Sequence, residues 1–199
     1  MSNEIVKYNN ELNFVPFNNF NKREFNILFV IISKLKDKGT KKTELSFNEI
    51  KKLSNYKQRG NKFLKDLENV YNKILSLKIW RESSNVYESW VLFTYYKIDN
   101  NNQSISIKVN PDLSNILNNL SRWTRFNLEN FVLLNSTYSK TIFRLLKQYR
   151  VVGKRTFDLN NFKMLLGIPK SYRASDINKR VLQPIMIELS AYFKGLNIK

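Results

Sequence analysis

The fold is decided by residues 43–77, which read TELSFNEIKKLSNYKQRGNKFLKDLENVYNKILSL. The stretch begins with a short strand at 43–47, and Ser46 together with Glu49 forms a capping box that opens a short helix. A polar turn at 54–60 precedes a longer helix, whose apolar residues recur at helical spacing: Phe63, Leu64, Leu67, Val70, Tyr71, Ile74, Leu75 and Leu77. The stretch therefore predicts a strand and two helices joined by a polar turn.

The flanking residues extend this pattern in both directions. Upstream, Asn21 and Glu24 form another capping box, and the spacing of apolar residues predicts a helix that Gly39 ends. Residues 1–20 are an Asn-rich arm with room for one short strand. Downstream, the order helix, strand, helix, helix is completed by a β-hairpin, which gives the order of a winged helix. The strands are predicted from period-two alternation at 78–81, 89–97 and 104–109.

A weak internal repeat predicts a second unit of the same kind. Apolar residues match between 45–53 and 157–165, between 63–79 and 182–198, and between 25–32 and 142–149. Any two amphipathic helices align in this way, but three segments in one order at near-constant offsets favour a true repeat. We therefore expect an α+β fold of two tandem winged-helix (helix-turn-helix) domains, at 1–125 and 126–199.

The second copy reaches only the first strand of its wing, at 196–199. A complete wing needs a hairpin loop and a return strand after that. We therefore expect the second domain to lack its complete wing and to be truncated at the C-terminus.

The charge points to a polyanionic partner. Lys and Arg number 34 against 16 Asp and Glu, which gives a net charge of +18. Contacts from such residues to phosphates release counterions, so DNA or RNA is the expected partner. A ribosome-associated protein or a generally basic surface is the alternative. No segment joins a long apolar face to a basic one, so we expect no membrane partner.

Other classes are excluded by what the composition lacks. The absence of Cys and His removes disulfides, thiolate zinc sites, cysteine nucleophiles and Ser-His-Asp chemistry. No phosphate-binding Gly-rich loop is present. Acid pairs such as Asp66 and Glu68 are expected to be surface charges. We therefore expect no enzyme activity, no metal and no cofactor. With no export signal and no apolar run near the length of a membrane span, we expect a cytoplasmic protein.

The second repeat carries a concentration of hydrogen-bond donors typical of a recognition helix. Residues 170–173 form its turn, Ser175 and Asp176 are placed to cap the helix, and Asn178, Lys179 and Arg180 lie in its first turns. Arg pairs with guanine and Asn with adenine in the major groove. Tyr172 and Ser171 suit phosphate contacts, and Lys170 is a further phosphate candidate. The alternative is an ordinary solvated face on a core helix.

Further basic residues are candidates for phosphate contacts. The first repeat has a parallel, Lys-rich set, although its helix can also be a scaffold only. Arg122 and Arg125 lie between the two units and can clamp the backbone or pair with Glu129. The phosphate candidates outside the recognition turn are Lys57, Arg59, Lys62, Lys65, Arg122, Arg125, Ser139, Lys140 and Arg144.

Three segments resemble a known family. Residues 123–149, WTRFNLENFVLLNSTYSKTIFRLLKQY, resemble the central signature of iteron-binding plasmid replication initiators, and LGIPKSYR at 166–173 with DINKRVLQP at 176–184 resemble the second signature. The resemblance implies two winged-helix domains and binding to directly repeated sites, called iterons, at the origin of a theta-replicating plasmid. It implies that Tyr172, Arg173, Asn178, Lys179 and Arg180 read bases.

The resemblance also implies partners. The first domain would contact flanking DNA and carry a dimer interface. Monomers would initiate replication, and dimers would repress their own gene or pair origins. The protein would open an AT-rich region and recruit host replication proteins, such as a helicase or an initiator, in the bacterial cytoplasm. Two alternatives stay open: a winged-helix transcriptional repressor, which would bind a single palindrome as a dimer, and a nickase that uses Tyr and acidic residues.

Overall fold

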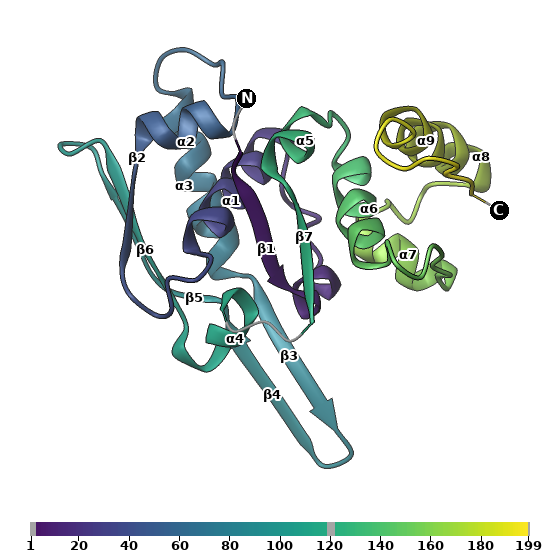
Figure 1. The fold of residues 1–199 in the computed structure, drawn as a ribbon, viewed down its shortest axis with the longest axis horizontal. Coiled ribbons are helices and arrows are strands. Elements are labelled where there is room, and N and C mark those ends of the chain that lie inside the picture. Colours follow the sequence, from purple (N-terminus) through teal and green to yellow (C-terminus); the bar gives the residue numbers. More distant parts are fainter. Residues whose placement is uncertain (1–2, 119–121, 199) are drawn as a thin grey trace.

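The computed structural model describes residues 3–118 and 122–198, and its centre is one buried helix (Figure 1). This helix is α1, Lys22–Leu35, whose side chains from Glu24 to Ser33 are all buried. The Asn21 side chain accepts from the backbone N–H groups of Arg23 and Glu24, and the Glu24 carboxylate accepts from Asn21 N at 2.8 Å. The predicted capping box is thus confirmed. The helix ends at Leu35, earlier than the glycine that was expected to cap it.

A three-stranded antiparallel sheet and two helices complete the first winged helix. The strand order is β2 (Thr43–Ser46), β6 (Ser104–Val109) and β5 (Phe93–Asp99), with Leu45 opposite Ile105. Helix α2 spans Phe47–Leu53 and α3 spans Lys62–Leu75. The Ser46 hydroxyl accepts from Glu49 N at 3.2 Å, which confirms one half of the predicted capping box, whereas the Glu49 carboxylate pairs with Lys34 at 2.9 Å.

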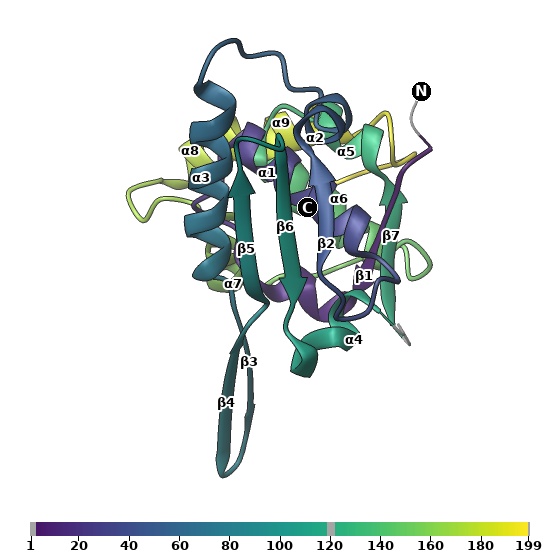
Figure 2. The ribbon, with the colours of Figure 1, turned by 90° about the vertical axis from the view of Figure 1, so that its left-hand side faces the viewer.

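One predicted strand is wrong, because residues 89–97 form two strands. Strand β4 (Val86–Val91) pairs with β3 (Lys78–Ser83) in a hairpin that projects from the body of the protein (Figure 2), whereas β5 joins the main sheet. The chain changes sheets at Leu92, whose side chain is buried. Its backbone N–H donates to Leu77 O, and its carbonyl accepts from Asn110 N. Burial of the Leu92 side chain interrupts the alternation of inward and outward residues that a single strand would show.

The N-terminal arm forms a second, smaller sheet. Strand β1 (Ile5–Asn9) pairs antiparallel with β7 (Trp123–Asn127), with Lys7 opposite Arg125. The single strand expected in the arm is present, but its partner was not predicted. The 3-10 helix η1 (Asn10–Phe14) follows β1, and short helical segments flank β7: η2 (Pro111–Leu113), α4 (Ser114–Leu117) and α5 (Leu128–Leu133).

Among the described residues after β7, every regular element of the second half is a helix, and turns or irregular segments join these helices. Helix α6 spans Thr137–Gln148 and α7 spans Leu159–Leu166, and the segments α8 (Ala174–Ile177), η3 (Asn178–Leu182) and α9 (Gln183–Leu189) run on without a break. The sequence predicted a wing strand at 196–199. Residues 196–198 form no paired strand, and Lys199 lies outside the described residues.

The elements that pack around α1 and α6 give the molecule two opposite faces. Helix α1 packs against α3 and also against β1, and α6 packs against both β7 and α9. Figure 2 shows α3 and α8 on one side of the molecule and β1 and β7 on the opposite side. We call the side with α3 and α8 the recognition face and the side with β1 and β7 the ribbon face.

Candidate nucleic-acid interface

The turn before α8 is fixed by backbone geometry. Gly167 ends α7 in the left-handed conformation at φ +66°, and Ile168 N donates to Lys163 O at 2.9 Å. The carboxylate of Asp176 accepts from Arg173 N at 3.2 Å, so Arg173 is the N-cap and Asp176 closes the first turn. Asp176 therefore caps the helix as predicted, whereas Ser175 is the second residue of the helix and not its N-cap. The turn leaves Lys170, Ser171 and Arg173 exposed.

The recognition helix has one apolar and one polar side. The buried side chains recur every four residues and hold the helix in the core: Ile177, Val181, Ile185 and Leu189. Asn178, Lys179 and Arg180 lie between the first two of these and are exposed. The sequence placed these three polar residues in the first turns of the helix. Burial of one side thus presents three consecutive polar side chains on the other.

Arg180 and Tyr172 form a small preorganised unit on this side. The Arg180 guanidinium lies 5.3 Å from the Tyr172 ring, and its Nε is 3.5 Å from Asp176 Oδ1. Hydrogen bonding to Tyr172 and the charge of Asp176 raise the pKa of Arg180 above its ordinary value. Tyr138 on α6 interacts with the Tyr172 hydroxyl in turn. A guanidinium held in this way loses less conformational entropy when it binds a planar acceptor such as a guanine edge.

The helix widens where the three polar residues lie. Residues Asn178–Leu182 form a π-helical turn, in which Gln183 N donates to Asn178 O. Pro184 has no N–H and cannot donate to Arg180 O, so it removes one bond of the normal α-helical ladder. π-Bulges occur frequently at functional sites. This π-helical turn was not predicted from the sequence, although Pro184 is the signal for it.

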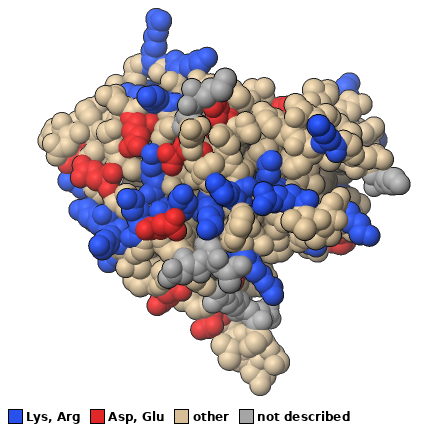
Figure 3. Space-filling model, in the orientation of Figure 1, with Lys and Arg blue, Asp and Glu red and all other residues tan. Residues whose placement is uncertain are grey.

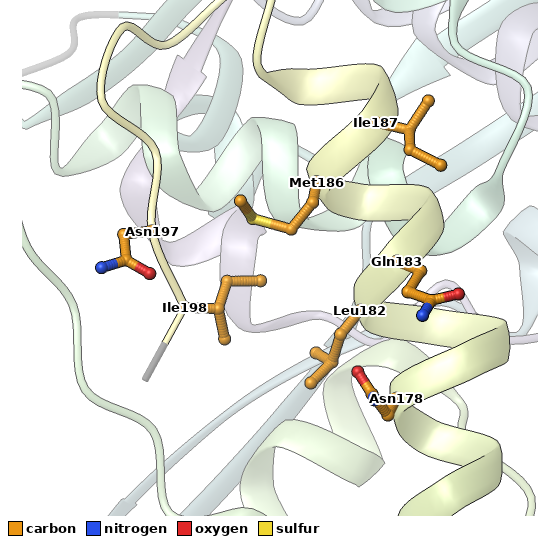
Figure 4. A pocket seen from close by; sticks show the side chains of 7 residues that line it. All are labelled: Asn178, Leu182, Gln183, Met186, Ile187, Asn197 and Ile198. Atoms are coloured by element: carbon orange, nitrogen blue, oxygen red, sulfur yellow. The ribbon is translucent and has the colours of Figure 1, made fainter.

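A shallow hollow of about 280 Å³ lies beside the widened turn (Figure 4). Asn178 lies at one end of it, and the side chains of Met186 and Ile198 point into it from opposite walls. Apolar groups next to an amide suit the thymine methyl and adenine edge that the major groove presents. The remaining lining residues are Leu182, Gln183, Ile187 and Asn197.

The Lys-rich set of the first unit lies on the recognition face. Lys57 and Arg59 are exposed in the turn before α3, and Lys62 and Lys65 are exposed on the helix itself. None of the four takes part in an ion pair within residues 3–118 and 122–198. Unpaired cations at the start of a helix, where the backbone N–H groups are free, suit phosphate binding.

Asp66 is not the surface charge that was expected. It is 5% exposed, and its Oδ2 accepts from the Tyr56 hydroxyl and from Arg23 Nε, each at 2.7 Å. Burial raises the pKa of Tyr56, and the bond to Asp66 adds to the shift. These contacts attach the turn to α3 and α1, and this turn carries Lys57 and Arg59.

Three of the predicted phosphate contacts are corrected by the structure. Ser139, Lys140 and Arg144 are at most 1% exposed, so their side chains cannot reach a phosphate in this structure. The Lys140 ammonium donates to Phe131 O, and burial holds the pKa of Lys140 well below its ordinary value. The physical reason is the position of α6, which lies between β7 and α9 and turns its polar residues toward buried backbone carbonyls.

Arg122 and Arg125 are exposed but lie elsewhere. They belong to the ribbon face, opposite the recognition helix (Figure 2). The alternative pairing with Glu129 is absent, since the described residues contain no ion pair between these side chains. The structure therefore gathers the other exposed candidates on one face and separates these two from them.

In the part of the chain that the structure describes, no helix is long and apolar enough to cross a membrane. In the same residues, no three acidic side chains are grouped as they would be to hold a metal ion.

The geometry defines a protein with tandem winged-helix units and an exposed recognition helix, and comparison with known proteins gives the family. Residues 5–147 match the family model "Initiator Replication protein, WH1", and residues 158–199 match "Initiator Rep protein, WH2". The chain therefore belongs to the initiator replication protein family, and its fold consists of two winged-helix domains.

One relative and one solved structure illustrate the match. Over 204 residues the chain is 36% identical to the "Probable replication protein rep" of Bifidobacterium longum (strain NCC 2705). The alignment covers 100% of this chain and 68% of that protein. The fold is similar to that in the crystal structure of the Pi initiator protein in complex with iteron DNA. The TM-score is 0.71 at 12% identity, over 100% of this chain and 95% of the other.

Proposed function

We propose that this protein is a plasmid replication initiator that binds directly repeated sites in duplex DNA. The observation that carries the proposal is the exposed row Asn178, Lys179 and Arg180 on the widened helix of the second winged helix. In helix-turn-helix proteins such residues meet base edges in the major groove. Family membership supports the same function.

The base-reading set and the phosphate-binding set have separate roles. Tyr172, Arg173, Asn178, Lys179 and Arg180 read the repeat. Lys170 and Ser171 hold the adjoining phosphates, and Lys57, Arg59, Lys62 and Lys65 hold flanking DNA, because both groups are exposed on the recognition face. One duplex that follows this face meets both winged helices.

The division of labour between the two units follows the same pattern. The first unit, residues 1–125, carries flanking DNA contacts and the dimer interface, and the second, residues 126–199, recognises the repeat. The protein acts in the bacterial cytoplasm without catalysis of its own. It opens an AT-rich region of the origin and recruits host replication proteins, such as a helicase or an initiator.

The test is a nuclease footprint on the DNA that flanks the gene, at physiological salt. We expect several protected direct repeats at a constant spacing. Protection of a single palindrome would instead identify a repressor, because two-fold symmetry in the site mirrors a symmetric dimer. Incubation with supercoiled origin DNA and Mg²⁺ completes the test, since a strand-specific nick or a covalent adduct would contradict the non-catalytic role.

A further inference from the structure

A tight turn before α1 presents two asparagines to solvent. Asn18 and Asn19 are its central residues, and Phe20 N donates to Phe17 O at 3.1 Å to close it. Asparagine is favoured in such turns because its amide can bond to nearby backbone groups. The Phe17 and Phe20 side chains are buried, with ring centres 5.9 Å apart. These two rings anchor residues 17–20, which we call the arm turn, in the core of the first unit.

The arm turn is connected to α3. Lys73 Nζ, on α3, lies 5.7 Å from the centre of the Phe20 ring. The same ammonium pairs with the buried carboxylate of Glu24 on α1. The position of the arm turn is therefore tied to the helix that carries Lys62 and Lys65.

The Asn18 side chain reaches the second unit. Its Nδ2 donates to Met164 O at 2.9 Å. Met164 lies in the last turn of α7, where the carbonyls cannot all be satisfied within the helix. A donor from the first unit therefore completes the end of α7, just before Gly167, at which the turn to the recognition helix begins.

Gly167 leaves the room that Asn18 occupies. A Cβ atom added at position 167 would lie 2.7 Å from both Asn18 Cβ and Asn18 Cγ, and 3.0 Å from Asn18 Oδ1. The other four glycines of the chain, all among the described residues, would have nothing within 4 Å of an added Cβ. The close approach at Gly167 is therefore a contact between the two units and is separate from the positive φ that the helix end requires.

Other contacts hold the recognition helix within the second unit. The Tyr172 hydroxyl interacts with Tyr138 on α6, and α9 packs against α6. The contact of Asn18 with Met164 and Gly167 has a different consequence. It relates the start of the recognition turn to the arm turn, and through the arm turn to α3.

We propose that Asn18 is a positioning residue, which sets the separation between the recognition helix and α3. Both α3 and α8 lie on the recognition face (Figure 2), so this separation determines the spacing between the bases that are read and the flanking phosphates. Fixing the two units in advance lowers the cost of binding a repeat of matching length and disfavours other lengths. This inference rests on the proposed function, because it requires one duplex to meet both units.

A first test needs no DNA. The chain contains no Cys, so spin labels on Glu68→Cys in α3 and Lys179→Cys in the recognition helix report the distance between the two. Asn18→Asp keeps the size of the side chain but replaces the donor by an acceptor, and we expect it to broaden or shift the distance distribution. Asn19→Asp, the neighbouring exposed residue of the same turn, is the matched control and should leave the distribution unchanged.

A second test measures spacing on DNA. One base pair is inserted between the parts of the repeat that the two units protect, and the outer end is trimmed to keep the length. A band of Lys and Arg side chains crosses the face drawn in Figure 3, so charge-driven binding to any duplex is expected, and two duplexes of equal length share it. Asn18→Asp should bind the original repeat about threefold more weakly, because it loses one hydrogen bond, and should bind the lengthened repeat as the parent chain does. A merely structural role would weaken binding to both duplexes equally.

A third test isolates the contact at Gly167. Gly167→Ala adds both backbone strain and the clash with Asn18, whereas Gly153→Ala, at φ +74° with open space around it, adds strain alone. Asn18→Gly removes the clash. We therefore expect Gly167→Ala to shift the label distance in the parent chain and to shift it much less in the Asn18→Gly background, and Gly153→Ala to shift it in neither.

Each other outcome is decisive. An unchanged label distance in Asn18→Asp would overturn the proposal, and so would equal weakening of binding to the original and lengthened repeats. Equal shifts by Gly167→Ala with and without Asn18→Gly would show that the contact does not set the separation. If no repeat is protected in the footprint and the shift in Asn18→Asp remains, the proposed function fails, and Asn18 still sets the separation between the two helices.

Discussion

The guanidinium of Arg144 donates a hydrogen bond of 2.9 Å to the carbonyl of Leu12 and so ties α6 to the N-terminal arm. The same side chain donates to the Tyr8 hydroxyl at 3.2 Å and lies 4.5 Å from the Phe17 ring. Arg144 is 1% exposed. Arg144 is a buried cation of α6 that is hydrogen-bonded to the N-terminal arm, far away in the sequence. Helix α6 is therefore a core element shared by the two units rather than the first helix of an independent domain.

The first prediction follows from this contact. Arg144→Ala should lower the free energy of unfolding by about 2–4 kcal/mol, because it leaves a cavity and removes the donor for Leu12 O. Arg144→Met fills the space and should cost less, since it also removes the desolvation of a charge. Urea unfolding measures both. The exposed Arg150→Ala is the control and should change stability by less than about 0.5 kcal/mol. Equal losses for Arg144→Ala and Arg150→Ala would contradict a structural role.

A second prediction concerns the contact between the recognition helix and the start of α6. The Glu188 carboxylate on α9 accepts from Asn135 N at 2.9 Å and from Ser136 N at 3.1 Å. These are free donors at a helix start, where a negative charge is favourable. Glu188→Ala should lower the free energy of unfolding by about 1.5–3 kcal/mol. Thermal unfolding compares it with Glu68→Ala, an exposed glutamate on α3, and similar melting temperatures for the two variants would show that the cap is dispensable.

The third prediction separates base reading from phosphate binding. Arg180→Ala should cost about 1–3 kcal/mol of binding to the repeat and relax specificity at one base pair. Lys62→Ala should weaken all duplexes alike and lower the salt slope by about one. Titrations against the repeat and against random duplex measure both effects. Equal losses on the two duplexes for both variants would remove the division of labour.

Local patterns predicted the helices well. A capping box and the period of apolar residues placed the start of α1, and the run of polar residues placed the exposed side of the recognition helix, because these depend on neighbours within a few residues. The winged-helix order was also predictable, since each element has its own period. The exposure of Asn178 and Arg180 follows from burial of Ile177 and Val181 on the opposite side.

Contacts between distant segments were not predictable in the same way. Lys140 and Arg144 read as a solvated helix face, and only the fold supplies the carbonyls of Phe131 and Leu12 that accept from them. The change from one sheet to the other at Leu92 likewise depends on hydrogen bonds to Leu77 and Asn110. The alternation of residues along one strand contains no information on these contacts. Charge patterns gave Arg122 and Arg125 as candidates for phosphate contacts, but the face on which they lie depends on pairing between β1 and β7.

The last prediction is a pH dependence in the loop between β5 and β6. Lys97 donates to Asp99 Oδ2 at 2.7 Å and Asn102 N donates to Asp99 Oδ1 at 3.1 Å, and these bonds lower the pKa of Asp99 to about 2. The folded pKa is below the ordinary value of 3.8, so the stabilisation is present above about pH 4 and is lost as pH falls toward about 2. Asp99→Asn should therefore show a smaller fall in melting temperature between about pH 5 and pH 2 than the wild type. Asp112→Asn is the matched exposed control. If the pH profile of Asp99→Asn follows that of the wild type, the loop gains no stability from the ionised carboxylate.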